Sequence, residues 1–155
     1  IQKVDMIRGI IPDVSLTTDI IIGFPAETDN DFEDTMDIVK YVEFDSVYMF
    51  QFSPRPGTKA YDMEDEFVNQ DIIKKRFQHL KDVQTDISEK RLKRYVGTKQ
   101  LLLIEKPSKK NNRVLTGKID SGQITHIDKK NVSIGDIVQV KITDSTPFYL
   151  KAELI

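Results

Sequence analysis

The stretch from residue 15 to residue 31 constrains the fold of this chain more than any other. At its centre are three consecutive β-branched residues, Ile20 to Ile22, an apolar run typical of a strand that is covered on both faces. Gly23 follows, and because it has no side chain, a flat ligand or another backbone could lie against it. Pro25 ends the strand, since proline cannot donate to a β-ladder. A threonine and acidic residues at nearly capping-box spacing then indicate the start of a helix.

The neighbouring segments extend this strand into a βαβ unit. Residues 29–43 carry apolar side chains at helical spacing, and residues 45–52 are rich in β-branched and aromatic residues. A strand, a helix and a strand in this order predict two parallel neighbours joined by a right-handed crossover. The pattern also predicts a helix that ends near residue 11 and a long helix over residues 70–95 with a basic C-terminal end.

The second predicted strand ends in a proline-rich loop, Ser53 to Thr58. Two prolines and a glycine in six residues predict a rigid loop, and a plain turn would explain that composition. However, the loop follows the carboxyl end of a parallel strand, where α/β folds bind their ligands. It also carries a cation, Arg55, so the sequence makes it a candidate binding loop.

The character of the chain changes after residue 98. Short alternating or apolar runs separated by turn residues predict a small antiparallel barrel. The predicted strands are residues 101–104, 113–119, 123–127, 137–143 and 148–154. We therefore expect two domains, an α/β domain over residues 1–92 and an all-β domain over residues 93–155.

The two predicted domains differ in charge. Residues 1–92 contain 11 Lys and Arg against 19 Asp and Glu, whereas residues 93–155 contain 12 against 6. A basic segment joined to an acidic one indicates that the basic segment meets a polyanion. The alternative is that these lysines only keep a small β domain soluble.

Several classes of protein are excluded or disfavoured by composition. The chain has no cysteine, which excludes disulfides and cysteine-ligated metals within these residues. No apolar run approaches the ~18–20 residues that cross a bilayer, and no export leader is visible, so we expect a cytoplasmic protein without membrane contact. No metal ligand set is evident, and His79 has no second ligand-type residue at metal-binding spacing.

Three motifs in order carry a resemblance to a known family. The strings D-I-I-I-G-F-P-A-E-T and F-Q-F-S-P-R-P-G-T resemble the last barrel strands of the radical S-adenosylmethionine methylthiotransferases. The later string G-D-I-V-Q-V-K-I-T resembles the TRAM domain, an OB-like RNA-binding module. Only Ala26 and Phe52 depart from the family pattern, where glycine and tyrosine are more usual. The resemblance implies the C-terminal part of a radical S-adenosylmethionine β/α barrel followed by a TRAM barrel.

The resemblance also implies an activity. Such enzymes cleave S-adenosylmethionine to a radical that abstracts hydrogen from C2 of a tRNA adenosine, where a methylthio group is inserted. The R-P-G-T string favours the members that modify N6-isopentenyladenosine beside the anticodon. The family uses two [4Fe–4S] clusters held by cysteines. Because this chain has none, we expect it to be inactive alone, with the cluster ligands outside it and no catalytic residue within it.

The resemblance assigns roles to particular residues. S-adenosylmethionine would be flanked by Ile21, Gly23, Phe24, Phe52 and Ser53. The tRNA would be contacted by Arg55, Lys106, Lys109, Lys110, Arg113, Lys118, His126, Lys129 and Lys130, mainly through phosphates. The implied partners are a tRNA anticodon stem-loop and a reductant protein such as a flavodoxin, and the protein is expected to be a monomer.

Other functions remain open from the sequence. The chain could belong to a stand-alone TRAM-type RNA-binding protein, because the basic segment needs no cluster. It could belong to a methylthiotransferase acting on threonylcarbamoyladenosine of tRNA or on a ribosomal protein. A domain that binds no nucleic acid is the third alternative, since residues 98–147 have few of the aromatic side chains on which OB-like folds stack bases.

Overall fold

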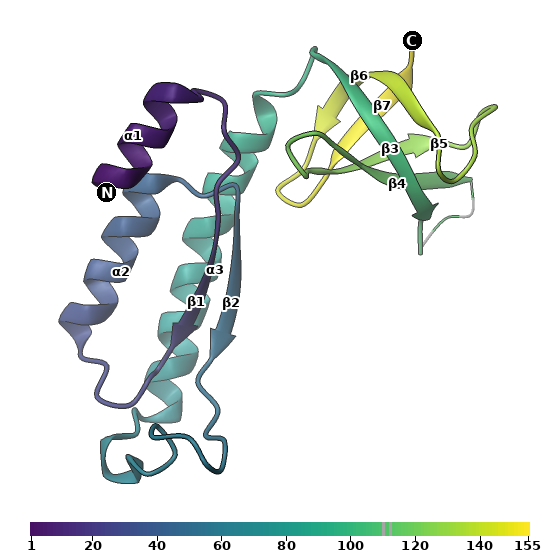
Figure 1. The fold of residues 1–155 in the computed structure, drawn as a ribbon. Coiled ribbons are helices and arrows are strands. Elements are labelled where there is room, and N and C mark those ends of the chain that lie inside the picture. The colour runs from purple at the N-terminus through teal and green to yellow at the C-terminus, as the bar shows by residue number, and fades with distance from the viewer. Residues whose placement is uncertain (110, 112) are drawn as a thin grey trace. The chain divides into compact units, whose positions relative to one another are not determined.

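The computed structural model describes residues 1–109, 111 and 113–155, and it divides into two compact units (Figure 1). The α/β unit comprises Ile1–Ile87, and the barrel unit comprises Ser88–Ile155. The division falls within one long helix, α3 (Gln70–Lys93). Among the helices of the described residues, none has the length and apolar character needed to cross a membrane.

The α/β unit has the predicted order of elements. They are α1 (Gln2–Ile10), β1 (Thr17–Ile22), α2 (Asp29–Val42), β2 (Ser46–Gln51), the 3-10 helix η1 (Glu64–Glu66) and the first part of α3. Strands β1 and β2 pair in parallel, which confirms the predicted βαβ unit. The predicted start of α2 is also confirmed, because Thr28 and Asp31 form a reciprocal capping box.

The core of the α/β unit lies on one face of the two-stranded sheet. Ile22 packs there with Met36 and Val39 from α2 and with Ile73 and Leu80 from α3. The other face carries Ile21, Tyr48 and Phe50, which are 52%, 58% and 51% exposed. The prediction of a strand covered on both faces is therefore wrong for the described residues, since the helices of this unit pack against one face of its sheet.

The barrel unit is a closed five-stranded sheet. Its strands are β3 (Lys99–Pro107), β4 (Val114–Ile119), β5 (Ile124–Asp128), β6 (Ile137–Ser145) and β7 (Leu150–Leu154), paired in the order β3-β4-β5-β7-β6. Alternate residues such as Leu102, Ile104 and Ile142 point inward and are buried. Leu92 and Tyr95, at and just beyond the end of α3, join this core.

One pairing corrects the prediction of an antiparallel barrel. Strands β5 and β7 run in parallel, with Thr125 opposite Leu150, whereas the other four pairings are antiparallel. The reason is topological. Strand direction alternates around a fully antiparallel ring, and five strands cannot alternate all the way round, so closure requires at least one parallel pair.

Candidate functional sites

A buried guanidinium holds the β1–α2 loop against α3. Arg76 of α3 is only 7% exposed, and its Nη2 donates to Asp29 Oδ1 at 2.6 Å. Its Nη1 donates to the carboxylate of Glu27 and, at 3.2 Å, to the Glu27 carbonyl oxygen. The second carboxylate oxygen of Glu27 accepts the backbone N–H of Gly23 at 2.8 Å. This set of contacts, which we term the corner clamp, joins the strand end, the loop and α3.

The corner clamp is a charged structural site. Burial acts to lower the pKa of Arg76, but hydrogen bonds to Asp29 and Glu27 outweigh it, so the pKa lies above its ordinary value. The guanidinium also lies 5.5 Å from the ring centroid of Phe32, within cation–π range. The guanidinium of Arg76 therefore bonds to groups of the fold itself, and the corner clamp positions the β1–α2 loop.

Our sequence reasoning missed this clamp, although a signal was present. Arg76 lies three residues after Ile73 and four before Leu80, both of which are buried, so helical spacing places it on the buried stripe of α3. A cation on a buried stripe needs an acidic partner. Glu27, inside the G-F-P-A-E-T string, is that partner.

The structure gives Gly23 a role in packing, besides the predicted contact with a ligand or another backbone. Gly23 is buried with a φ of +79°, and a Cβ atom at this position would strike the side chain of Ile73. The space beside its Cα is thus filled by the protein core. Backbone conformation and helix packing require glycine here, whether or not a ligand binds nearby.

The backbone conformation of Ala26 explains why glycine is more usual at this position in the family pattern. Its φ is +65°, in the left-handed region that disfavours residues with a Cβ atom. Its N–H donates to the Glu66 carbonyl oxygen at 2.9 Å, which ties the loop to η1.

The remaining candidates for S-adenosylmethionine binding lie where β1 and β2 end. Phe52 is half-buried, with its ring centroid 5.4 Å from that of Phe24 and 5.7 Å from that of Phe67, both in edge-to-face geometry. Phe24 is 46% exposed, and Ser53 is exposed. This apolar surface fits the flank of an adenine ring. Arg55 is exposed in the following loop, where its carbonyl oxygen accepts the hydroxyl of Thr58 at 2.9 Å.

The residues of this chain do not fit an iron–sulfur cluster. It contains no cysteine, and the part that the structure describes holds no group of three or more acidic or histidine side chains suited to a metal.

A row of outward-facing polar side chains crosses all five strands of the barrel. Lys106 on β3 lies opposite Thr116 on β4, which lies opposite His126 on β5. His126 lies opposite Lys151 on β7, which lies opposite Asp144 on β6. Register shifts between Ile104 and Lys106, and between Ile142 and Asp144, place both ends of the row on the outer surface. We call this set the polar row.

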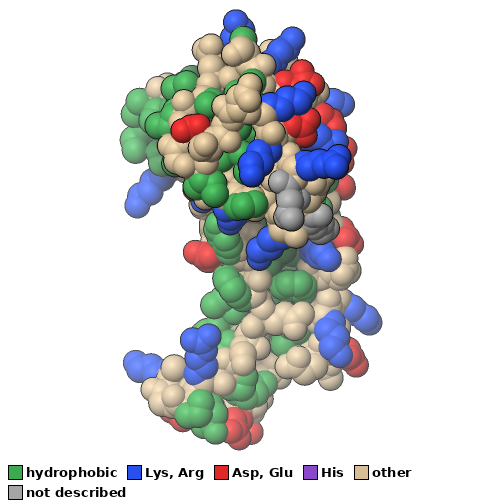
Figure 2. All heavy atoms as spheres, turned by 90° about the vertical axis from the view of Figure 1, so that its right-hand side faces the viewer, with side chains coloured by type: hydrophobic (Ala, Val, Ile, Leu, Met, Phe, Trp, Pro, Cys, Tyr) green, Lys and Arg blue, Asp and Glu red, His purple; other side chains and the backbone are tan. Residues whose placement is uncertain are grey.

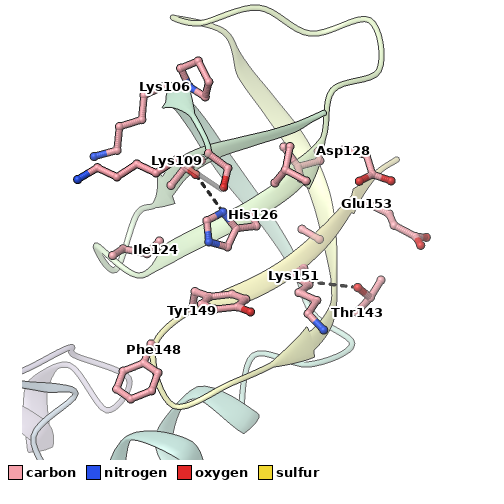
Figure 3. Close-up of a pocket in the computed structure, with 16 residues that line it drawn as sticks. Lys106, Lys109, Ile124, His126, Asp128, Thr143, Phe148, Tyr149, Lys151 and Glu153 are labelled. Carbon is pink, nitrogen blue, oxygen red and sulfur yellow. Dashed lines mark hydrogen bonds between the residues drawn. The ribbon is translucent and has the colours of Figure 1, made fainter. Parts of the chain in front are cut away.

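Four members of the polar row, Lys106, Thr116, His126 and Lys151, line a cavity of about 710 Å³ (Figure 3). His126 lies in its wall, with Nδ1 2.9 Å from Thr116 Oγ1 and its ring centroid 4.5 Å from that of Tyr149. Burial lowers the pKa of His126 despite a backbone hydrogen bond at Leu115 that favours the charged form. His126 is therefore mainly neutral at pH 7, and it offers hydrogen bonds rather than charge.

The structure brings only some of the predicted tRNA contacts to the cavity. Lys106, Lys109 and His126 line the cavity, together with Tyr149 and Lys151, which were not among the predicted tRNA contacts. The exposed residues Arg113, Lys118, Lys129 and Lys130 are not among the residues that line it, and Lys110 falls outside the described residues. Strand alternation was the available signal, because Tyr149 and Lys151 flank the inward-facing Leu150.

The basic side chains of the described residues form no uninterrupted patch on the face seen in Figure 2. On the face seen in Figure 2, Lys and Arg side chains are spread among acidic and hydrophobic ones. On this face, charge alone therefore does not define a binding surface, and the cavity of the barrel unit is better defined.

The class of the barrel unit follows from its closed five-stranded topology and from a family comparison. Residues 93–155 match the family model described as "TRAM domain". The barrel unit is therefore a TRAM domain, as the G-D-I-V-Q-V-K-I-T string predicted.

Similarity to curated proteins extends over nearly the whole chain. A protein of Corynebacterium jeikeium named tRNA-2-methylthio-N(6)-dimethylallyladenosine synthase is 40% identical, over 96% of this chain and 30% of its own length. Proteins with the same name from Geobacillus kaustophilus and Clostridium botulinum are 41% and 42% identical over the entire chain, which covers 29% and 34% of their lengths. The chain thus spans about a third of the length of the curated relatives that it matches.

These matches identify the chain as homologous to the C-terminal region of the tRNA methylthiotransferases. The resemblance inferred from the ordered motifs is confirmed, and the fold class that it implied agrees with the TRAM barrel. The roles of individual residues remain predictions.

Proposed function

We propose that this chain is the tRNA-binding and cofactor-flanking portion of a radical S-adenosylmethionine methylthiotransferase. The whole enzyme would add a methylthio group to C2 of an N6-isopentenyladenosine next to the tRNA anticodon. The observation that carries the proposal is identity of about 40% across nearly the whole chain to relatives named for this product. Their names favour this substrate over threonylcarbamoyladenosine or a ribosomal protein.

The α/β unit would contribute one wall of the cofactor site. Ile21, Phe24 and Phe52 would flank the adenine of S-adenosylmethionine with apolar surface, beside Ser53, while the corner clamp holds their loop in place. S-adenosylmethionine, when bound, supplies the radical chemistry of the family. The cluster ligands would lie outside these residues, because the chain has no cysteine.

The barrel unit would hold the tRNA. Its lysines and arginines supply sequence-independent phosphate contacts, which position a nucleic acid. Arg55 would face the substrate nucleotide, since a guanidinium offers a fixed fork of donors. The proposed partners are the anticodon stem-loop and a reductant protein of the flavodoxin kind, and the proposed setting is a cytoplasmic monomer.

A stand-alone RNA-binding function is the second candidate. It is favoured by the closed barrel, whose core is built from its own residues and needs no neighbouring sheet.

Nucleoside analysis of tRNA tests the proposal. Deleting the gene should abolish 2-methylthio-N6-dimethylallyladenosine and leave N6-dimethylallyladenosine in its place, as measured by mass spectrometry of hydrolysed tRNA. Re-expression of the gene with Phe24→Ala should restore less product than re-expression with Ile38→Ala, a matched exposed position on α2. Unchanged methylthiolation after deletion would contradict the enzyme proposal. Loss of methylthio from threonylcarbamoyladenosine would reassign the substrate.

A further inference from the structure

The cavity of the barrel unit combines features that phosphate binding alone does not require. Phosphate contacts need cations that reach a backbone, and surface lysines suffice for that. Here an aromatic and imidazole surface lines about 710 Å³, a volume within the ~300–1,000 Å³ range of pockets for small organic ligands.

The first feature is an aromatic side chain that the local backbone places at the cavity. Phe148 is 69% exposed, and it sits on a turn in which Thr146 makes several contacts. The Thr146 hydroxyl accepts the N–H groups of Phe148 and Tyr149 at 3.3 and 3.1 Å, and the Thr146 N–H donates to the Tyr149 carbonyl oxygen at 2.9 Å. The turn therefore presents two consecutive aromatic rings without a large loss of freedom on binding.

The second feature is a neutral hydrogen-bonding group beside those rings. A neutral imidazole has one donor and one acceptor nitrogen. In His126, Nδ1 is engaged with Thr116, which orients the ring next to Tyr149 (Figure 3). With Nδ1 engaged, the ring can offer one hydrogen bond, through Nε2, to the edge of a base.

The third feature is a charge gradient across the opening. Lys106 and Lys109 lie together at one side of the cavity, whereas Asp128 and Glu153 lie at the other (Figure 3). Lys151 also lines the cavity, but its charge is paired with Asp144. A phosphate is attracted to the first side and repelled from the second. A bound nucleotide would therefore enter with its phosphate toward the lysines.

We propose that this cavity binds one unstacked nucleobase of single-stranded RNA, with the base against Phe148 and Tyr149, its edge toward His126, and its phosphate toward Lys106 and Lys109. The proposal rests on the RNA-binding role proposed above and deepens it. It gives the TRAM domain a part in reading bases, in addition to positioning the backbone. Unstacked bases held on aromatic rings are the usual basis of RNA recognition in loops.

The test compares two short RNA strands of equal length, one of uridylate and one of abasic ribose-phosphates. Both carry the same phosphates, so the ratio of their dissociation constants isolates the contribution of bases. We expect the full 155-residue chain to bind the uridylate strand about 10-fold more tightly at low salt, since stacking of one base is worth ~1–3 kcal/mol.

Variants test whether the contribution of the bases to affinity arises at the cavity. Phe148→Ala should lower uridylate affinity about fivefold and leave abasic affinity unchanged, given the range for stacking. Ile137→Ala is the matched control, because it is also an exposed apolar residue of the barrel, 68% exposed, and does not line the cavity. Lys106→Gln with Lys109→Gln should weaken both strands equally. Circular dichroism verifies that each variant is folded.

Two results would overturn the proposal, and they are distinguishable. If the wild-type chain binds both strands with equal affinity, the barrel binds RNA through phosphates only, and the base site is wrong while the proposed function stands. If it binds neither strand at low salt, both the base site and the RNA-binding role fail.

Discussion

The two units of this chain differ in whether their sheets have open edges. In the barrel unit, every strand has a hydrogen-bonded neighbour on both sides, because the sheet closes on itself. In the α/β unit, the sheet has only two strands, and one of its faces carries exposed Ile21, Tyr48 and Phe50. Exposed strand edges and apolar faces favour association with another sheet or surface.

The two units differ in the contacts that stabilise them. The barrel relies on an enclosed apolar core that includes Leu102, Val140 and Ile142. The α/β unit has a core on one face of its sheet and adds the corner clamp, a buried ion pair at the strand end that is a candidate for cofactor contact. The core of the barrel unit is thus formed by its own residues, whereas the geometry of the α/β corner depends on polar contacts.

The largest loss of stability should come from adding a Cβ atom at Gly117 in the barrel. A Cβ atom there would strike the Leu103 carbonyl, which is backbone and cannot rotate away. Gly117→Ala should therefore cost about 3 kcal/mol or more, above ordinary overpacking. Hydrogen exchange read by mass spectrometry should show lost protection in the barrel unit only. Gly9→Ala, at a glycine with nothing within 4 Å of the added atom, is the control and should be neutral or slightly stabilising.

Removal of the corner clamp should destabilise the α/β unit and leave the barrel unit unaffected. Arg76→Met leaves the mostly buried carboxylate of Glu27, whose side chain is 12% exposed, without its guanidinium. Removing one partner of a buried ion pair typically costs ~3–5 kcal/mol. We expect the lower end, about 3 kcal/mol, because the Asp29 carboxylate is 93% exposed and remains hydrated. Protection should fall in the α/β unit and persist in β3 to β7. Lys74→Met, on an exposed turn of the same helix, should change little, and an equal loss in both variants would argue against the clamp.

A smaller change should stabilise the α/β unit. Ala26→Gly removes a Cβ atom from a residue with a φ of +65°, and relief of that strain exceeds the entropy cost of glycine. We expect a gain of about 0.5–1 kcal/mol in the free energy of unfolding, measured by denaturant titration. Ala60→Gly, at a position with ordinary φ, should not stabilise. If both variants destabilise, the loop conformation is different from that described.

The smallest expected effect is the dependence of the stability of the barrel unit on pH. The pKa of His126 is lowered in the folded state, so the unfolded chain binds the proton more readily. Stability should thus be highest above the unfolded value of ~6.5 and should decrease slightly as pH falls below it toward the folded pKa. His126→Gln should reduce this slope in thermal unfolding experiments between pH 7 and about 5. His79→Gln, which removes the other histidine of the chain, is the comparison.

Local patterns were sufficient for much of this architecture. The Ile-Ile-Ile-Gly-Phe-Pro string, helical spacing and turn residues predicted the helices and strands within a few residues, because periodicity and breakers act over short distances. The ordered motifs also predicted the TRAM domain and the similarity to tRNA methylthiotransferases.

Long-range packing was required for the rest. Gly23 packs against Ile73, 50 positions away in the sequence, and Glu27 binds Arg76, 49 positions away. No local periodicity encodes contacts over such separations. The polar row depends on two register shifts and on a parallel pair that closes the ring. His126 and Tyr149 become neighbours because β5 and β7 pair, although each residue alone is an ordinary member of an alternating strand. Strand alternation indicates which side chains face outward, but only the pairing of distant strands brings them to one cavity.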